Sequence, residues 1–320
     1  MKNFRAIIKN CNNFGNDIKL ASGLILDLNN KINRHGYKGC STQEFGSYWF
    51  SSPKGFVIFK NIDKTMGFVG DIQLLNEIVC FRLAKQMGID VAEYMPAQIN
   101  NVKGVASVNF VKKDEKLLSA IELIGPCGRN IKAIMRALIP ETTRYDVDFS
   151  QIFYGLYRMT IFDLLTFQSD RHLNNISFIL NQKNILRLAP MYDNEYSFFV
   201  TSYLFNHFDF DFDSVEDYVD NYYIGTGVIG VEPVVDVERI NCYDTYIKQV
   251  VEVAKVDSDS DKILKSLLNK ADLSSIYSDL KKEGYIINKD YEKFTCSLID
   301  FAKNRIKALY GEKLKNDLQR

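Results

Sequence analysis

One segment in the middle of the chain limits the possible folds most strongly, because its pattern requires the backbone to turn back on itself. Residues 152–167 form an apolar run at helical spacing. Two short, largely apolar runs follow at 176–180 and 185–189, and the polar residues 181–184 separate them. Such a pattern predicts a helix, a loop and then a β-hairpin.

Three polar side chains are predicted to meet at one end of this hairpin. With the turn centred in its polar residues, the strand partner of Asn175 lies close to Pro190, so Asp193 follows a few residues beyond the same end. Asp170 precedes the first strand at that end. A carboxylate can orient or deprotonate an acceptor hydroxyl, and an amide with a second carboxylate can hold a Mg²⁺ ion that bridges phosphates. The arrangement therefore favours phosphoryl transfer.

Polar residues at hairpin ends also have a simpler use, since Asp and Asn commonly cap turns there. The order of the residues argues against that use alone. Asp-x-His-x-x-Asn stands directly before one strand, and Ala-Pro-x-Tyr-Asp stands directly after the returning strand. Because the two parts would seldom occur in this order by chance, we favour a catalytic site.

Composition and charge exclude several classes of protein. The chain has 320 residues, 46% of them hydrophobic and 25% charged, as in globular rather than disordered or fibrous proteins. The 40 basic residues balance the 40 acidic ones, so no overall field would hold the chain on nucleic acid or on an anionic membrane. No uncharged apolar stretch approaches ~20 residues, and no secretory signal pattern is present. We expect a cytoplasmic protein without direct nucleic-acid binding or membrane association.

The residue pattern divides the chain into a β-rich first part and a helical second part. Short strand-like runs fill the first third, and periodic apolar residues at 71–87 predict one helix among them, with Asp71 as N-cap and Gly88 just past its end. From about Asp114 the sequence favours helices. The predicted strands are 4–8, 24–28, 48–50, 56–59 and 102–111, and the predicted later helices are 152–167, 263–268 and 294–309.

Four short motifs carry a resemblance to a known family. Residues 169–175 read SDRHLNN and residues 189–193 read APMYD. The strand run at 56–60 and the pair 76–77, which lie upstream, are part of the same resemblance. Across about 39–197 the chain resembles the HipA-like serine/threonine protein kinases. The resemblance implies ATP and Mg²⁺ as cofactors and a protein substrate with a Ser/Thr acceptor.

The same resemblance implies an α+β, protein-kinase-like fold of two lobes. The N-lobe, residues 1–112, would be β-rich and bind nucleotide, and the C-lobe, residues 113–320, would be mainly helical and carry the catalytic loop and metal site. Long family members have an additional N-terminal subdomain, and we expect this chain to be a compact member without it. Toxin-like, self-phosphorylating activity and a small DNA-binding antitoxin as partner are further implications.

The resemblance also gives roles to individual residues. Asp170 takes the acid–base role, while Asn175 and Asp193 hold the metal. Lys60 contacts the α- and β-phosphates and is positioned by Glu77, so both join Asp170 as catalytic candidates. Read from the residues alone, a lysine on an apolar strand is poorly placed unless an anion meets it. The alternative is that Lys60 ends its strand in solvent and that Glu77 lies on an exposed helix face.

The nucleotide-binding residues are predicted from two further stretches. Residues 36–45 match the family's phosphate-covering loop, whose backbone N–H groups can bind phosphate. This loop lacks the lysine that many relatives place after the Gln, and a surface turn is the alternative. Adenine would lie against the end of the strand 102–111. The predicted residues, besides Lys60, are Ser41, Thr42, Gln43, Ser107, Val108, Asn109 and Phe110, and the first two are the expected self-phosphorylation sites.

Three other features invite functional interpretation. We expect His172 to order neighbouring backbone, and Arg171 either to pair with an anion of the acceptor or activation segment or to lie in solvent. Residues 257–261 resemble the start of a calcium-binding EF-hand, but Lys262 stands where that loop requires Gly, so a cap for a helix near Ile263 is expected. The Phe/Asp alternation at 208–213 is interpreted as a half-buried edge.

Two alternative functions stay open. Phosphatidylinositol 3- and 4-kinases, which are lipid kinases, also use Asp-Arg-His-x-x-Asn, but their metal motif ends Asp-Phe-Gly, whereas residues 193–195 here are Asp-Asn-Glu. A catalytically dead pseudokinase would serve as a binding module instead. Retention of Lys60, Asp170, Asn175 and Asp193 together argues against a dead site.

Overall fold

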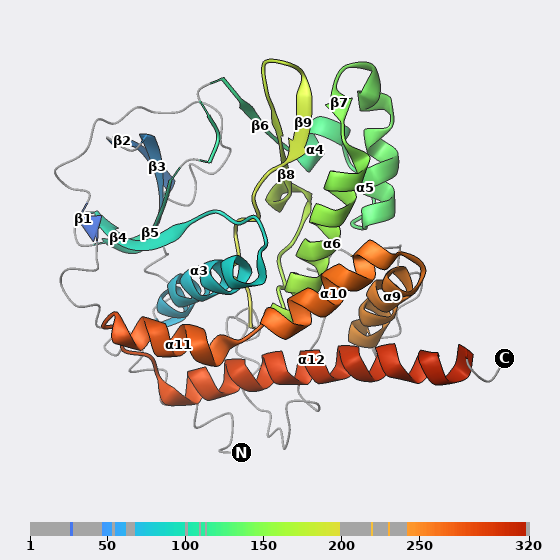
Figure 1. The fold of residues 1–320 in the computed structure, drawn as a ribbon. Helices are drawn as coiled ribbons and strands as arrows, with labels where there is room; N and C mark the ends of the chain where they lie inside the picture. Colours follow the sequence, from blue (N-terminus) through green and yellow to red (C-terminus); the bar gives the residue numbers. More distant parts are fainter. Residues whose placement is uncertain are drawn as a thin grey trace.

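A computed structural model describes residues 26–27, 47–52, 55–61, 68–99, 102–108, 110–112, 114–198 and 242–317, together with Val219 and Gly230. Within these residues the protein is a mixed α+β structure in which one sheet lies beside a larger helical region that contains a second, smaller sheet (Figure 1). The predicted strand 4–8, the loop 36–45 and the alternation 208–213 lie outside the described residues.

The first sheet is formed by the N-terminal part of the described chain. Its strands are β1 (Leu26–Asp27), β2 (Ser47–Ser52), β3 (Gly55–Asn61), β4 (Tyr94–Ile99) and β5 (Val102–Val108). They lie in the order β1-β4-β5-β3-β2, with β1 parallel to β4 and the other neighbours antiparallel. Lys60 lies opposite Val105 in this register, so its backbone is next to the central strand. The sequence pattern predicts all of these strands except β4.

The second sheet is built around the predicted hairpin. Its strands are β6 (Lys116–Ser119), β7 (Asp146–Val147), β8 (Ser177–Leu180) and β9 (Ile185–Leu188), in the order β6-β8-β9-β7. Phe178 pairs with Leu188, so the hairpin prediction is confirmed and Asn175 falls opposite Met191, one residue past Pro190. The prediction that helices begin near residue 114 is wrong at β6, which is too short to show an alternating pattern.

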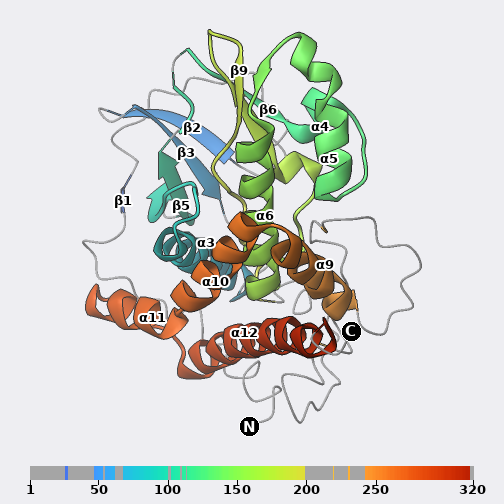
Figure 2. The ribbon, with the colours of Figure 1, turned by 45° about the vertical axis from the view of Figure 1, so that its right-hand side comes forward.

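The other described elements are mainly helices. They are α3 (Phe68–Met87), α4 (Ala120–Ile124), α5 (Ile131–Leu138), α6 (Phe149–Thr166), α9 (Cys242–Val256), α10 (Ser258–Lys270), α11 (Leu273–Lys282) and α12 (Lys289–Asp317). α6 is the central one, because α5, α9, α10 and α12 all pack against it. Figure 2 shows α12 running along one side of the molecule, below α6 and α9.

α3 lies between the first sheet and the C-terminal helices. It contacts β4 and β5 on one side and α10 and α11 on the other. Every residue of 72–80 is buried as a result, which explains why apolar residues surround this helix rather than forming one stripe. The helix begins at Phe68, so the prediction of Asp71 as N-cap is wrong, whereas Gly88 follows its end with a φ of 78°, as a left-handed terminating residue does.

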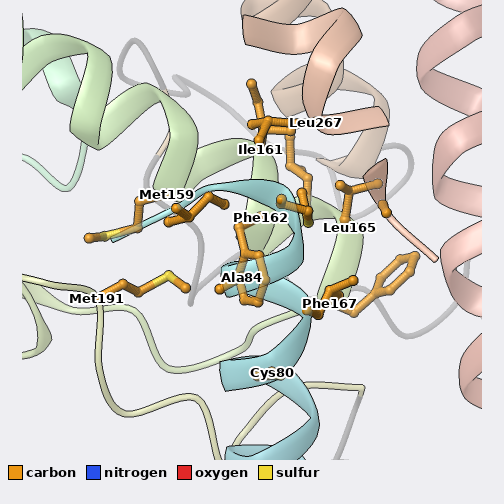
Figure 3. Close-up of a cluster of buried hydrophobic side chains, with 14 of the residues drawn as sticks. Cys80, Ala84, Met159, Ile161, Phe162, Leu165, Phe167, Met191 and Leu267 are labelled. Atoms are coloured by element: carbon orange, nitrogen blue, oxygen red, sulfur yellow. The ribbon is translucent and has the colours of Figure 1, made fainter. Parts of the chain in front are cut away.

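The hydrophobic core joins these elements. Figure 3 shows side chains of α3, α6 and α10 packed together, with Met191 from the segment after β9 among them. Asp257 caps α10 by accepting a hydrogen bond from Ser260 N at 2.9 Å, so the acidic run at 257–261 is a helix start, five residues earlier than predicted. None of the described helices is both long enough and apolar enough to cross a bilayer.

Candidate active site

The loop between α6 and β8, residues 167–176, carries Asp170 and Asn175. α6 ends at Phe167, whose φ of 52° is left-handed and turns the chain out of the helix. Asn175 Nδ2 donates a hydrogen bond to the carbonyl oxygen of Asp170 at 2.8 Å, which fixes the amide beside the catalytic candidate. The Asp170 side chain is 39% exposed, as a group that must reach a substrate needs to be.

Gln168 connects this loop to the segment after β9. It is buried, its Oε1 accepts from Asp170 N at 3.0 Å, and its Nε2 donates to the carbonyl oxygen of Asp193 at 3.1 Å. One amide side chain therefore spans the backbones of two predicted site residues. The structure places Asp170, Asn175 and Asp193 at the same end of the hairpin, where its register predicts them.

The segment after β9, residues 189–198, is called here the β9 exit segment. It holds Asp193 with a φ of 63°, a conformation uncommon for residues other than Gly, Asn or Asp. Its neighbours fix the backbone on both sides, because Met191 forms a bridge with Val91 and Asp193 N donates to the Tyr94 hydroxyl at 3.3 Å. The α3–β4 connection thus supports the residue predicted to bind metal.

Arg171 binds the β9 exit segment from its buried side. Nε and Nη2 donate to the Asp163 carboxylate on α6, both at 3.1 Å, and the guanidinium is 0% exposed. Nη1 donates to Tyr192 O at 2.5 Å, and Nη2 also donates to Asn194 Oδ1 at 2.7 Å. Both expectations for Arg171, an acceptor-side or activation-segment anion and a solvated surface position, are wrong, because its donors are used inside the protein to connect α6 with the residues on either side of Asp193.

Burial and pairing act on this ion pair in opposite directions. Burial lowers the pKa of the Arg171 guanidinium, but the Asp163 carboxylate outweighs burial and that pKa lies above its ordinary value. Burial raises the pKa of Asp163, and the bonds from Arg171 compensate only in part. The carboxylate therefore depends on its partner, since a buried charge left alone costs about 3–5 kcal/mol.

Glu77 of α3 faces the β9 exit segment. It is fully buried, and its Oε2 accepts a hydrogen bond from Asn194 N at 3.0 Å, so the alternative that places Glu77 on an exposed helix face is wrong. Carboxylate oxygens of Glu77, Asp193 and Glu195 all lie within 4.8 Å of one another. Oxygen donors at this density suit a hard divalent cation. For Lys60 the structure describes the backbone, which lies in β3. The pairing of its side chain with Glu77 stays a prediction.

The predicted adenine side lies at the end of β5. Ser107 is buried there next to Val108, and the Phe110 ring stacks on Tyr192 with centroids 6.2 Å apart. The Tyr192 hydroxyl donates to the carbonyl oxygen of Asn174 at 2.8 Å. These contacts connect the end of β5 to both site loops. Four predicted nucleotide-binding residues lie outside the described residues: Ser41, Thr42, Gln43 and Asn109.

The His172 side chain lies beside the Asp170 carboxylate. Its Nε2 is 3.8 Å from Asp170 Oδ1. Its backbone is more engaged, because His172 N donates to Asp170 O at 3.1 Å and His172 O accepts from Asn175 N at 2.8 Å. The backbone of His172 therefore helps to shape the loop that holds Asp170 and Asn175.

Four buried polar residues of the site are given no role by the motif analysis, although one of them, Asn76, lies in a matched motif: Asn76, Asp163, Gln168 and Asn194. Each acts on partners that only the tertiary fold identifies. A usable signal exists for one of them, because Asp163 interrupts the apolar run 152–167 and a carboxylate inside a buried helix requires a cation or donors nearby.

Comparisons with known proteins place the chain among relatives. Residues 52–216 match the family of HipA-like C-terminal domains. No curated protein matches the chain significantly. A Helicobacter pylori structure, the proinflammatory kinase CtkA, is similar with a TM-score of 0.65 and 15% identity over 90% of this chain and 98% of that chain, which shows a common kinase-like fold.

A second similar structure is more distant. Shewanella oneidensis MR-1 HipA, solved with HipB and operator DNA, shares 13% identity over 80% of this chain and 57% of that chain, with a TM-score of 0.45. Because the family match spans just over half of its residues, the chain belongs to the HipA-like C-terminal domain family.

Proposed function

We propose that the chain is an ATP-dependent serine/threonine protein kinase of the HipA-like type. The observation that carries the proposal is the direct connection among Asp170, Asn175 and Asp193 through the Gln168 and Asn175 amides. In the proposed reaction the acceptor oxygen bonds to the γ-phosphorus, the bond from that phosphorus to the β–γ bridging oxygen breaks, and ADP leaves. The half-exposed Asp170 carboxylate orients the acceptor hydroxyl and takes its proton.

The donors around Asp193 suit Mg²⁺, which prefers carboxylate and amide oxygens. Asn175 would offer Oδ1, because its Nδ2 is used by the Asp170 carbonyl, and Asp193 would offer its carboxylate. Glu195 is close enough to contribute as well, which the motif analysis does not predict. When bound, Mg²⁺ would neutralise charge on the phosphates.

The nucleotide would lie between the first sheet and the two site loops. Lys60 and Glu77 are proposed to hold the α- and β-phosphates, and the end of β5 to hold adenine. Support comes from the burial of Glu77 beside Asp193 and from the stacking of Phe110 on Tyr192. The division into lobes at residues 1–112 and 113–320 is part of the same proposal.

Incubation with radiolabelled ATP and Mg²⁺ tests the function, with a cell lysate and lipid vesicles as separate acceptors. We expect label on protein, and at least ~100-fold less of it with Asp170→Asn. Asp259→Asn is the matched control, because it removes an exposed carboxylate on α10 that pairs with Lys262. Label in lipid would indicate a lipid kinase, and ATP binding without any transfer would indicate a pseudokinase.

Self-phosphorylation and an antitoxin partner are separate proposals from the family resemblance. After incubation with Mg-ATP, mass spectrometry would find phosphate on Ser41 or Thr42 in the chain without substitutions. It would find none there in the Asp170→Asn variant. Unmodified loop peptides from a protein that phosphorylates another substrate would contradict self-phosphorylation. The antitoxin proposal is tested by binding of a purified small DNA-binding protein encoded beside this chain.

A further inference from the structure

A buried amide on α3 fixes the β9 exit segment just after Asp193. Asn76 is 0% exposed, and its Nδ2 donates to the backbone oxygens of Glu195 at 3.1 Å and Ser197 at 2.8 Å. Glu77, the next residue, accepts from Asn194 N. Two adjacent side chains of α3 therefore hold three backbone groups within four residues of the segment.

The orientation of Asn76 is itself fixed from the C-terminal helix. Because carbonyl oxygens can only accept, Nδ2 must face Glu195 and Ser197, and Oδ1 is left to accept a hydrogen bond. The hydroxyl of Tyr291 on α12 donates that bond, and Tyr291 is fully buried. Without this donor the amide oxygen would be a buried acceptor lacking its partner, which is costly.

Tyr291 belongs to a longer buried polar connection. Thr295, one turn later on α12, donates to Tyr291 O at 3.0 Å, and the Tyr277 hydroxyl of α11 lies 2.7 Å from Thr295 Oγ1. All three side chains are buried. Thr295 and Tyr277 reach only the backbone oxygen of Tyr291, whereas the Tyr291 hydroxyl itself contacts Asn76 of α3 and, through it, the segment that carries Asp193 and Glu195.

We propose that Tyr291 is a positioning residue of the candidate active site, acting through Asn76. The residue lies outside the stretch 52–216 that matches the family, so the family motifs do not assign it. Its hydroxyl holds the Asn76 amide, and the amide holds the backbone oxygens of Glu195 and Ser197, two and four residues after Asp193. The effect on Mg-ATP rests on the proposed function, whereas the positioning itself does not.

Two matched variants test this inference in the full chain. Tyr291→Phe removes the hydroxyl that binds Asn76, and Tyr277→Phe removes a hydroxyl of equal burial that binds Thr295 and not Asn76. Hydrogen exchange of peptides covering 191–198 is measured first. We expect exchange about fivefold faster in Tyr291→Phe than in Tyr277→Phe, the effect of losing one net hydrogen bond.

ATP affinity is measured next by calorimetry with and without Mg²⁺. We expect Tyr291→Phe to bind Mg-ATP about fivefold more weakly than Tyr277→Phe, with equal affinities when Mg²⁺ is omitted. A general loss of stability would affect both variants alike. Equal exchange in the two variants overturns the positioning role, and faster exchange with equal Mg-ATP affinity overturns its role in the site. Selectively faster exchange in a chain that binds no ATP supports the positioning role and counts against the kinase proposal instead.

Discussion

Asp193 combines a charge that the proposed chemistry needs with a backbone conformation that most residues avoid. Its φ of 63° suits Asn as well as Asp, whereas for Ala this conformation costs about 1 kcal/mol. Asp193→Asn should therefore remove the charge without straining the backbone, whereas Asp193→Ala should remove the charge, strain the backbone slightly and keep the fold. We expect phosphotransfer to fall more than ~100-fold in each. Thermal unfolding should occur about 2 °C lower in Asp193→Ala alone. Activity within a few-fold of the unmodified chain would contradict the metal-ligand role.

Substitutions at Arg171 can distinguish its contribution to stability from its role in positioning the β9 exit segment. Arg171→Met leaves the Asp163 carboxylate buried without its cation, and we expect urea denaturation to show a loss of about 3–5 kcal/mol. Adding Asp163→Leu removes the buried charge, so most of that stability should return. Phosphotransfer should stay low in the double variant, because Tyr192 O and Asn194 Oδ1 have lost their donor. A double variant no more stable than Arg171→Met would show that the ion pair is not the cause.

Short-range spacing explains which site residues the sequence reveals. Asp170 and Asn175 lie five positions apart in one loop, and the hairpin register brings Asp193 to them, so local patterns suffice. Asn76 differs, because its partners lie 119, 121 and 215 positions away along the chain. The role of Arg171 likewise depends on burial that the local pattern does not show, with a carboxylate in the preceding helix and two residues beyond the hairpin as its partners. Buried polar partners of this kind become visible only in the fold.

At the scale of elements, α3 is fixed to the C-terminal helices as well as to the site. Arg82 of α3 binds the Glu283 carboxylate at the end of α11 through two hydrogen bonds, of 2.6 and 2.5 Å. Gln86 Nε2 donates to the carbonyl oxygen of Lys270 at 2.7 Å, at the end of α10. The helix that carries Asn76 and Glu77 is thereby held from outside the first sheet.

This ion pair gives a pH prediction. The hydrogen bond from Arg82 lowers the pKa of Glu283 below its ordinary value of 4.5, so the pair contributes stability that is complete above that value and is lost as the pH falls through the folded-state pKa. Glu283 is 40% exposed, so we expect less than about 1 kcal/mol. The melting-temperature difference between the unmodified chain and Glu283→Gln should be constant well above pH 4.5 and shrink as the pH falls below that value through the folded-state pKa.

The control for this prediction is Glu93→Gln. This variant removes an exposed carboxylate that pairs with Lys85, which lies on α3 as Arg82 does. A Glu283→Gln difference that persists unchanged at low pH would show that the effect is not electrostatic.

Regular elements are predictable where an apolar run is bounded by a clear polar or glycine signal. α6 is such a run, the polar residues 181–184 mark the turn of the β8–β9 hairpin, and Gly88 marks the end of α3. β4 is harder to predict, because it contains Pro96, which cannot donate a ladder hydrogen bond. In the register of β4, Pro96 is paired on the β5 side. On its other side, β1 pairs with Ala97 and Gln98 and not with Pro96 within the described residues, so the missing N–H of Pro96 interrupts no described pairing with β1. β7, only two residues long, offers no pattern to detect.

At the scale of the whole molecule, the family match and the folded unit differ in extent. The match covers 52–216, whereas the described site and core continue into α9–α12. α10 and α11 cover α3, and α9 and α12 cover α6. α3, which carries Asn76 and Glu77, therefore lies between the first sheet and a C-terminal layer that the motifs do not mark.

This extent predicts how a shortened chain behaves. A chain ending at residue 241 lacks α9–α12 and would expose apolar side chains of α3 and α6 that are now buried, among them Leu83 and Leu164. We expect it to bind a hydrophobic dye and to lose cooperative thermal unfolding, as proteins do when tertiary packing is lost. A chain ending at Asp317 is the control and should unfold like the full chain. Cooperative unfolding and Mg-ATP binding by the shorter chain would mean that the family-matched stretch folds alone, and the C-terminal layer would then have no part in holding α3 against the site.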